Sequence, residues 1–353
     1  MVNHESLVDE RRVVGVADPR EGAPMTRVTL ADVAALVGVS AKSVSNVVNG
    51  TGWVGDDVRK RILAAIDELG YRPNLAARQL RNGRSGLIAL VLPDLREPYF
   101  AEFASQFVSA AQKRALTVLI SQTGGDREAE LAMMSGEGLP ALDGIVMSPL
   151  ALTSADLADR PAASSLVLIG EQAEALVGPT AHHVGIDNVA AAAAATSYLL
   201  ANGRRRIAAV GVQHSGPTAT SRLRFEGYLR ALRDAGIDPD PSLHATVEHF
   251  NRAGGSTAVE HLIDRGVEFD ALFCFSDSLA LGALYTLGSH GIDVPGTVQV
   301  MGFDAIEEGG FHIPAFSTVG HGDAEAAAEI LDILASAPTA GAHHKVPFSL
   351  IPR

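Results

Sequence analysis

Apolar residues recur at helical spacing between Thr29 and Asn49, and a glycine divides this stretch in two. The apolar positions before the division are Leu30, Val33, Ala34 and Val37, and those after it are Val44, Val47 and Val48. Gly38 can adopt the left-handed conformation that ends a helix, and Ser40 can cap a new helix soon afterwards. The pattern predicts two short amphipathic helices that cross steeply, because the turn between them is tight.

The first of these helices begins at a strong capping residue, and the second presents small polar side chains. The Thr29 hydroxyl can accept from the amide of Asp32, whose carboxylate can reach back toward Thr29. Because the valines of the second helix must face the core, the residues left outward are Ala41, Lys42, Ser45, Asn46 and Asn49. This arrangement is typical of a helix-turn-helix, which reads DNA in the major groove, although an ordinary helical hairpin with a polar outer face gives the same pattern.

A loop and a third helix complete a small helical headpiece, which we place at residues 26–72. The third helix runs from near Asp56 to Leu69, and we expect Trp53 and Val54 to cover the small core. Asn74 can then cap a short helix, and residues 82–86 are predicted to form a flexible joint. Two turns of helix are marginal in isolation, so this hinge, residues 73–86, is expected to order only against a partner chain or DNA.

From Leu87 onward, short apolar runs alternate with amphipathic helical stretches. The predicted strands are Leu87–Leu92, Thr117–Ser121, Gly144–Ser148 and Ser165–Ile169, followed by Ile207–Val212, Ala271–Phe275 and Val298–Phe303. The predicted helices include Tyr99–Arg114, Asn188–Ala201, Arg222–Ala235, Ala253–Arg265 and Ser278–His290. Repeated strand–helix–strand units build parallel sheets covered by helices. The predicted fold class is therefore a small all-α headpiece followed by an α/β body, residues 87–353, made of two similar halves.

The charge of the chain is distributed unevenly. Its formal net charge is −13, yet the stretch from Thr26 to Arg84 holds nine basic residues against five acidic ones. A basic head on an acidic body is expected where only the head meets phosphate. Residues 1–25 are polar and lack a hydrophobic face, so we expect them to be a disordered N-terminal extension.

The residue content also limits the compartment and the chemistry. Cys274 is the only cysteine, which excludes an internal disulfide, a cysteine-based zinc finger and an iron–sulfur site. No apolar run approaches the roughly 20 residues of a membrane span and no export signal opens the chain, so we expect a cytoplasmic protein without a membrane partner. The pairs His182-His183 and His343-His344 fall in predicted loops and are expected to be solvated. We therefore expect no metal site and no cofactor.

The motifs TLADVAALVGVSAKSVSNVVNG, LGYRPN and NLAARQLRNGRSGLIALVLPD resemble the lactose-repressor (LacI/GalR) family of bacterial transcription regulators. So do the segments DNVAAAAAATSYLLANGRRRIAAV, TSRLRFEGYLRALRDAGI and ALFCFSDSLALGALYTLGSHGIDVPGTVQVMGFD. The resemblance implies a DNA-binding headpiece, a hinge helix and a two-lobed effector domain similar to the type I periplasmic sugar-binding proteins. It also implies a homodimer on a pseudo-palindromic double-stranded DNA operator and a small-molecule effector, with a sugar as the expected class.

Matching positions imply the residues of two binding sites. Those toward DNA are Thr29, Ser40, Ala41, Lys42, Ser43, Ser45, Asn46, Asn49, Asn74, Ala77 and Leu80, the last as a wedge in the minor groove. Those toward the effector are Tyr99, Phe100, Ser148, Arg222, Phe250 and Asp277. The fork of donors on Arg222 and the carboxylate of Asp277 suit adjacent hydroxyl groups, while the aromatic residues suit the apolar faces of a ring. Asp277 could instead be the N-cap of the helix beginning at Ser278, or serve both purposes.

Two features depart from the family pattern. Gly320-His321-Gly322 replaces a polar crossover that often contains Gln-Pro, and no leucine heptad precedes Arg353, so a tetramer built on a C-terminal coiled coil has no support. An enzyme would need a motif such as GxGxxG, GxxxxGK[ST], GxSxG or HExxH, and we find none; a sugar-binding transport protein would need export. We therefore expect a ligand-responsive repressor of carbohydrate-metabolism genes rather than an enzyme, with a nucleoside or purine as the alternative effector.

Overall fold

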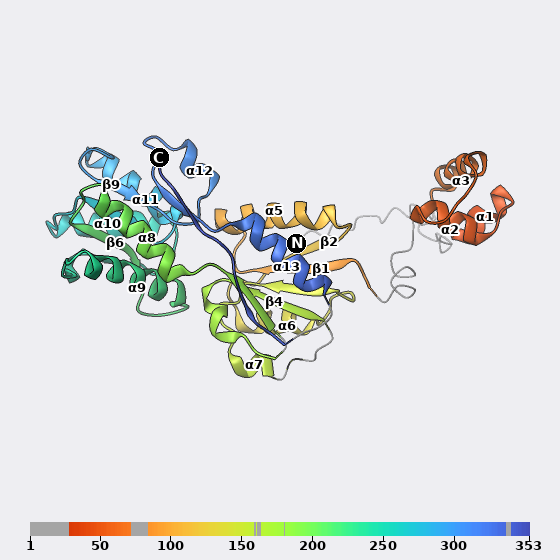
Figure 1. Cartoon of the computed structure of the whole chain (residues 1–353), viewed down its shortest axis with the longest axis horizontal. Helices are drawn as coiled ribbons and strands as arrows, with labels where there is room; N and C mark the ends of the chain where they lie inside the picture. Colours follow the sequence, from red (N-terminus) through yellow and green to blue (C-terminus); the bar gives the residue numbers. More distant parts are fainter. Residues whose placement is uncertain (1–27, 72–83, 159, 161–163, 180, 337–339) are drawn as a thin grey trace, which may run out of the picture. The chain divides into compact units, whose positions relative to one another are not determined.

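The computed structural model of the chain describes residues 28–71, 84–158, 160, 164–179, 181–336 and 340–353. These residues divide between two compact units, the headpiece before the hinge and the body after it (Figure 1). The predicted N-terminal extension and three of the predicted DNA-binding residues, Asn74, Ala77 and Leu80, lie outside the described residues.

Three helices form the headpiece: α1 (Leu30–Val37), α2 (Ala41–Asn49) and α3 (Asp56–Leu69). Thr29 and Asp32 make the predicted capping box, and Gly38 ends α1 in the left-handed conformation at φ 72°. The axes of α1 and α2 differ in direction by 110°. The predicted steep crossing is therefore confirmed, and the angle is typical of a helix-turn-helix.

The headpiece core is made of apolar side chains from all three helices. The buried residues are Val33, Ala34, Val37, Val44, Val47, Ile62, Ala65 and Tyr71. The prediction that Trp53 covers this core is wrong, because its side chain is 91% exposed. Tyr71, which follows the helix-ending Gly70, supplies the aromatic side chain instead, while Val54 packs partly buried against the core as predicted.

The first lobe of the body is a parallel six-stranded sheet in the order β11-β5-β4-β3-β1-β2. Its strands are β1 (Leu87–Leu92), β2 (Thr117–Gln122), β3 (Gly144–Met147), β4 (Ser165–Ile169), β5 (Ala181–Gly185) and β11 (His343–Lys345). Helices cover both faces. One face packs against α5 (Pro98–Lys113) and α13 (Asp323–Ala335), and the other against α6 (Arg127–Ser135), α7 (Ser154–Ala158) and the 3-10 helix η1 (Glu171–Leu176).

The second lobe is a parallel four-stranded sheet in the order β7-β6-β8-β9. Its strands are β6 (Ile207–Val212), β7 (His244–Thr246), β8 (Ala271–Cys274) and β9 (Gln299–Met301). Two helix pairs accompany it, α8 (Asn188–Ala201) with α9 (Ala219–Asp234) and α10 (Arg252–Asp264) with α11 (Asp277–Ser289). The remaining elements are η2 (Pro241–Leu243), α12 (Glu307–Phe311) and the antiparallel pair β10 (Thr318–Gly320) and β12 (Ser349–Ile351).

The chain passes between the lobes along three described segments: from β5 to α8, from β10 to α13, and from β11 to β12 (Figure 1). The predicted pair of α/β halves is therefore confirmed, with the last part of the chain shared between them. Most predicted strands agree with the observed ones to within one or two residues, but β5, β7, β10, β11 and β12 were not predicted.

The histidine pairs lie in strands, so the prediction that they occupy loops is wrong, and only His343 is exposed as expected. His182 and His183 belong to β5 and are buried, while His343 and His344 belong to β11, which extends the sheet beside β5. His182 Nδ1 lies 3.1 Å from His344 Nε2, and His344 Nδ1 lies 2.7 Å from Glu329 Oε1. Strands as short as β11 carry too few residues for an alternating pattern to be recognised.

The described end of the predicted flexible joint is bound to the first lobe. The Asp143 carboxylate accepts from the Ser85 amide at 2.6 Å and from the Gly86 amide at 2.9 Å. Arg84 Nη2 donates to the carbonyl oxygen of Leu334 at 2.7 Å. Residues 84–86 are therefore hydrogen-bonded to the first lobe through two backbone amides and the Arg84 side chain, and the flexibility of the joint stays a prediction.

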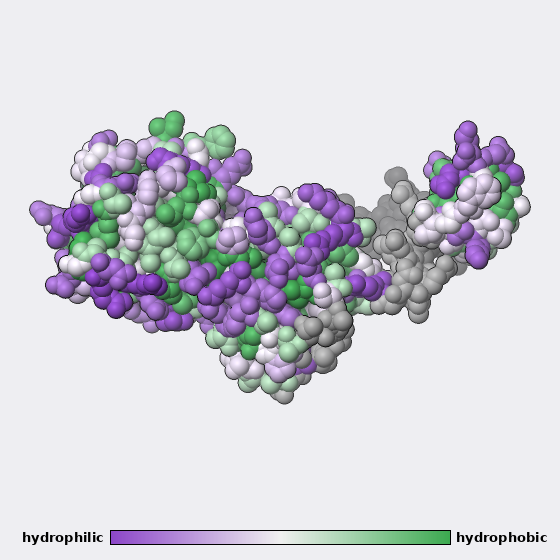
Figure 2. Space-filling view, viewed as in Figure 1, coloured by the Kyte–Doolittle hydropathy of each residue, from purple (hydrophilic) through white to green (hydrophobic). Residues whose placement is uncertain are grey.

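The visible surface of the body is mainly hydrophilic, with hydrophobic residues interspersed (Figure 2). Among the residues of the body that the structure describes, the exposed large apolar side chains are Leu95, Ile120, Tyr285, Phe311 and Ile313. None of the described helices is, on its own, both long and apolar enough to cross a membrane.

Candidate functional site

A cleft of about 750 Å³, counted with its part open to solvent, lies between the two lobes of the body. Its lining follows the carboxyl ends of parallel strands, with Ser148 after β3, Ser276 after β8 and Asp304 after β9. Ligands of open α/β sheets bind outside these strand ends.

Four of the predicted effector residues line this cleft: Tyr99, Phe100, Ser148 and Phe250. Tyr99 and Phe100 lie in the first turn of α5, with ring centroids 5.2 Å apart. Phe250 comes from the other lobe, just before α10. The fold therefore brings three aromatic rings and a hydroxyl from distant parts of the sequence around one space.

Arg222, in contrast, is exposed and does not line the cleft, so the prediction that it belongs to the cleft lining is wrong. Residues two apart on a helix differ in direction by about 200°, and the arginine on the buried side of α9 is Arg224. Its side chain is only 3% exposed and lines the cleft. A signal was present in the sequence, since Arg224, Tyr228 and Ala231 recur at the i, i+4, i+7 spacing of a buried helix face.

Asp277 does not line the cleft either, so the prediction that it belongs to the cleft lining is wrong. It is fully buried in the first turn of α11, where Oδ1 accepts from Thr318 Oγ1 at 2.7 Å and Oδ2 from the Ile306 amide at 2.9 Å. Burial raises its pKa well above the ordinary range. The alternative role as an N-cap is also wrong, because Ser276 caps α11 by accepting from the Leu279 amide at 3.2 Å. Asp277 instead connects α11 to Ile306 and to Thr318 of β10 by hydrogen bonds.

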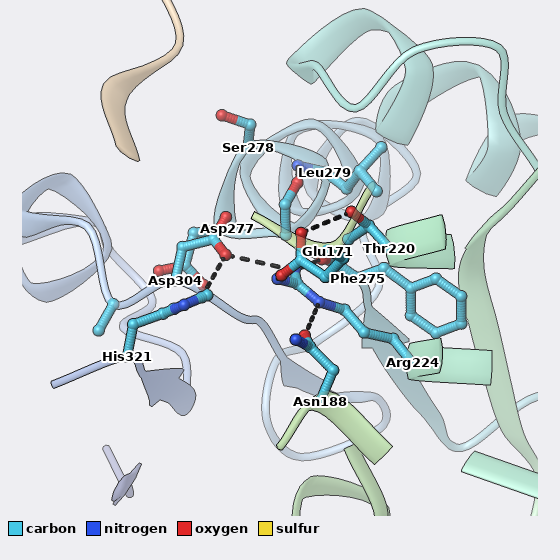
Figure 3. A network of polar contacts seen from close by, with 12 residues as sticks. Glu171, Asn188, Thr220, Arg224, Phe275, Asp277, Ser278, Leu279, Asp304 and His321 are labelled. Atoms are coloured by element: carbon cyan, nitrogen blue, oxygen red, sulfur yellow. Dashed lines mark hydrogen bonds and ion pairs between the residues drawn. The ribbon is translucent and has the colours of Figure 1, made fainter. Parts of the chain in front are cut away.

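Arg224 is the centre of a polar network in the cleft wall (Figure 3). Its Nε donates to Asn188 Oδ1 at 3.0 Å, Nη1 donates to Asp304 Oδ1 at 3.2 Å, and Nη2 donates to Glu171 Oε1 at 3.3 Å. The guanidinium carbon also lies 3.6 Å from the centre of the Phe303 ring. These contacts hold the guanidinium in one orientation, because its planar group of N–H donors is hydrogen-bonded to acceptors on several sides.

Glu171 connects the first lobe to the second through the same network. It begins η1, and it accepts from Thr220 Oγ1 at 2.8 Å in addition to Arg224. Burial by itself opposes ionisation of this carboxyl, but the charges of Arg224 and His321 outweigh it and hold the pKa of Glu171 at about 2. Glu171 is therefore a carboxylate at neutral pH.

His321, in the crossover from β10 to α13, lies in the cleft. Its Nε2 is 3.0 Å from Asp304 Oδ1, and its ring centroid is 4.9 Å from that of Tyr99 and 5.3 Å from that of Phe303. The departure from the family pattern at this crossover thus places an imidazole where it contacts residues of both lobes.

Two further carboxyl groups of the first lobe accept hydrogen bonds from the second. Ser278 Oγ donates to Glu97, and the Glu307 amide donates to Glu102 at 3.0 and 3.1 Å. Burial raises the pKa of Glu97 to about 7, and burial also raises that of Glu102. The two lobes are therefore joined by acidic acceptors on one side and neutral donors on the other.

Several cleft residues were missed in the sequence: Glu97, Glu171, Thr220, Arg224, Asp304 and His321. Glu171 and Asp304 come within three residues of the ends of β4 and β9. A charged residue at the carboxyl end of a parallel strand is a recognisable signal for such a cleft. His321 stands out in the sequence only as a departure from the family pattern.

The outer side of α2 carries the residues predicted to contact DNA. Ala41 and Lys42 are exposed, and Ser43 and Asn46 are partly exposed. Ser40 and Thr29 are engaged at helix starts, where Ser40 Oγ accepts from the Ser43 amide at 3.1 Å and Thr29 Oγ1 accepts from the Asp32 amide at 3.4 Å. The start of α2 therefore combines a lysine with the positive end of a helix dipole, which together favour phosphate.

Ser45 is only 8% exposed, so the prediction that it faces outward is wrong. Around the helix it is turned by about 60° from Val48, which packs partly buried against the core. The buried side of α2 is therefore wider than its valine stripe. Asn49 is the last residue of the helix.

Both units match family models. The model of bacterial regulatory proteins of the lacI family matches residues 29–74, and the model of periplasmic binding proteins and the sugar binding domain of the LacI family matches residues 85–332. The second match alone covers more than half of the chain.

Individual relatives agree with these matches. The chain is 32% identical over 294 residues to the HTH-type transcriptional regulator GalS of Salmonella typhimurium, covering 83% of this chain and 84% of GalS. A putative LacI-family regulator from Sanguibacter keddieii has 36% identity and a TM-score of 0.69, covering 76% of this chain and 97% of that structure. CelR, solved with cellobiose, has 27% identity and a TM-score of 0.62, covering 92% and 98%. The chain therefore belongs to the LacI family and is a ligand-responsive, DNA-binding transcriptional regulator.

Proposed function

We propose that the cleft between the lobes binds the effector of this regulator, and that the regulator represses genes of carbohydrate metabolism. The observation that carries the effector site is the position of Arg224, 3.3 Å from Glu171 of the first lobe and 3.2 Å from Asp304 of the second. A ligand that enters this cleft alters contacts of both lobes at once. It therefore binds one lobe arrangement better than another, which is the requirement for a switch.

The chemistry of the lining supports a sugar. Tyr99, Phe100 and Phe250 offer flat apolar surfaces, and Glu171 and Asp304 offer carboxylate acceptors for hydroxyl groups. A sugar ring needs both kinds of contact, because its faces are partly apolar and its edges carry hydroxyls. The likeness to CelR, solved with cellobiose, supports the same class of ligand.

On the DNA side, we propose that two chains form a homodimer whose headpieces read two half-sites of a pseudo-palindromic operator. Lys42 and Asn46 have donors for phosphates and base edges, and Ala41 can offer an apolar contact to a thymine methyl. Exposed apolar side chains on the body, such as Tyr285 and Ile313, support pairing through the effector domain. Ligand and operator then influence each other's affinity reciprocally.

The test combines ligand binding with DNA binding. Thermal denaturation of the full chain is measured with a panel of sugars and nucleosides, and a duplex selected by the protein from a random library is used for fluorescence anisotropy. We expect a panel compound to raise the melting temperature of the wild type, to have a much smaller effect on Arg224→Lys, and to change the affinity for the selected duplex. A compound that stabilises both proteins equally would place its site outside the cleft, and a bound compound without effect on DNA affinity would contradict the effector role.

A further inference from the structure

We infer, on the basis of the proposed effector role of the cleft, that this cleft selects uncharged hydroxylated ligands and excludes their phosphorylated counterparts. The inference rests on how the ionisable groups of the lining are paired with one another. It concerns the charge of the ligand and leaves open the identity of its ring.

The arginine of the cleft is already occupied by protein acceptors. Besides Asn188, Asp304 and Glu171, Arg224 donates to the backbone carbonyl of Phe275. Only 3% of its side chain is exposed. A ligand phosphate would have to displace these acceptors and leave buried carboxylates without their cation, which is strongly unfavourable.

The remaining groups do not provide a spare positive charge. Among the described residues that line the cleft, Arg224 and His321 are the basic ones, and Glu97, Glu171 and Asp304 are the acidic ones. The lining therefore holds two basic side chains against three acidic ones, and Arg224 lies 3.3 Å from Glu171 and 3.2 Å from Asp304. Because the basic side chains do not outnumber the acidic ones, a phosphate dianion finds no unpaired cation and meets repulsion from the carboxylates in a poorly solvated space.

The same carboxylates favour hydroxyl groups. Glu171 accepts from Thr220 and Arg224, and Asp304 accepts from Arg224 and His321. A carboxylate has about four acceptor positions, so each retains capacity for a ligand hydroxyl. Hydrogen bonds from a neutral hydroxyl to a carboxylate are strong and leave the internal charge balance unchanged.

The experiment uses matched pairs of compounds on the full chain: galactose and galactose 1-phosphate, glucose and glucose 6-phosphate, ribose and ribose 5-phosphate, adenosine and adenosine monophosphate. Dissociation constants are measured by isothermal titration calorimetry. We expect binding only among the uncharged members, with the phosphorylated partner of any bound compound weaker by about 100-fold or more.

A charge variant makes the cause testable. Glu171→Gln keeps the side-chain shape but removes one negative charge, so the ratio between phosphorylated and uncharged dissociation constants should narrow by about tenfold. Glu174→Gln removes the same charge from an exposed position of the same helix, and it should leave the ratio unchanged.

The outcomes separate this inference from the proposed function. A phosphorylated compound that binds the cleft more tightly than its uncharged partner overturns the inference while the effector role stands. Equal ratios in the two glutamate variants also overturn it, because charge would not be the cause. If neither set of compounds binds, the proposed function fails and the inference fails with it.

Discussion

Arg224 and Glu171 face each other across the lobes, with Nη2 3.3 Å from Oε1 and side chains that are only 3% and 15% exposed. The contact joins α9 of the second lobe to η1 of the first. Removing one partner of a buried ion pair leaves the other charged and unpaired, which costs far more than the net value of the pair. Stability and ligand response should therefore depend on the same side chain.

Arg224→Ala should remove the ligand-induced rise in melting temperature and lower the free energy of unfolding by about 3 kcal/mol, because Glu171 and Asp304 lose their shared cation. Arg222→Ala removes the same side chain from the exposed side of α9 and should change neither property. Both are measured by thermal and denaturant unfolding with and without ligand. Arg224→Lys, which keeps the charge without the fork, separates a binding defect from a folding defect. Similar behaviour of the Arg222 and Arg224 variants would contradict the assignment.

The burial of Glu97 should make stability depend on pH. Burial raises the pKa of Glu97 from 4.5 to about 7, so between these values the folded chain holds a proton that the unfolded chain releases. This contribution to stability is present below about pH 4.5 and is lost as the pH rises through 7. Glu97→Gln cannot ionise and should gain about 1 kcal/mol relative to the wild type between pH 5 and pH 8, after allowance for partial exposure. The measurement is the free energy of unfolding of both proteins as a function of pH. If the two curves run parallel, the ionisation of Glu97 does not affect stability.

On the headpiece, Lys42→Ala should weaken binding to a selected duplex about tenfold at low salt and reduce the salt slope of the binding constant by about one. The reason is that one phosphate contact, and its released counterion, is lost. Lys60→Ala removes an exposed lysine from α3 instead and is the matched control. Fluorescence anisotropy at several salt concentrations measures both. A wild-type slope for Lys42→Ala would remove this residue from the phosphate contacts.

Asp277→Ala should destabilise the body rather than act on ligand binding alone. The substitution leaves the Ile306 amide and the Thr318 hydroxyl without their acceptor inside the protein, at a cost of about 2 kcal/mol or more. The expected result is a lower melting temperature than that of the wild type. Ligand should still bind to the folded variant at low temperature and should still raise its melting temperature. Wild-type stability combined with a lost ligand response would restore the direct role expected from the sequence.

The sequence alone predicted the elements with strong periodicity. The strand Leu87–Leu92 agrees with β1 to the residue, and the helix expected near Asn188 to Ala201 is α8, because both combine apolar patterns with clear ends. The short strands β10, β11 and β12 have three residues each and no such pattern. They form because neighbouring strands offer a sheet edge, which is a property of the folded chain.

The cleft was predicted less completely for a similar reason. Tyr99, Phe100, Ser148 and Phe250 were found by resemblance, but the resemblance did not distinguish Arg222 from Arg224 in the sequence Arg-Leu-Arg. The buried face of α9 decides between them, since it is set by packing against α8. Asp277 illustrates the opposite error, in which a charged residue near the cleft is bound entirely by its own lobe.

Trp53, on the loop between α2 and α3, is the only tryptophan in the chain, and its 91% exposure leaves its indole ring open to solvent. Its fluorescence therefore originates from the headpiece alone, whereas circular dichroism is dominated by the much larger body. Recording both signals during one titration or one melt follows the two units separately in the unmodified protein. An added dye is unnecessary, because the chain carries its own optical label next to the helix that is proposed to read DNA.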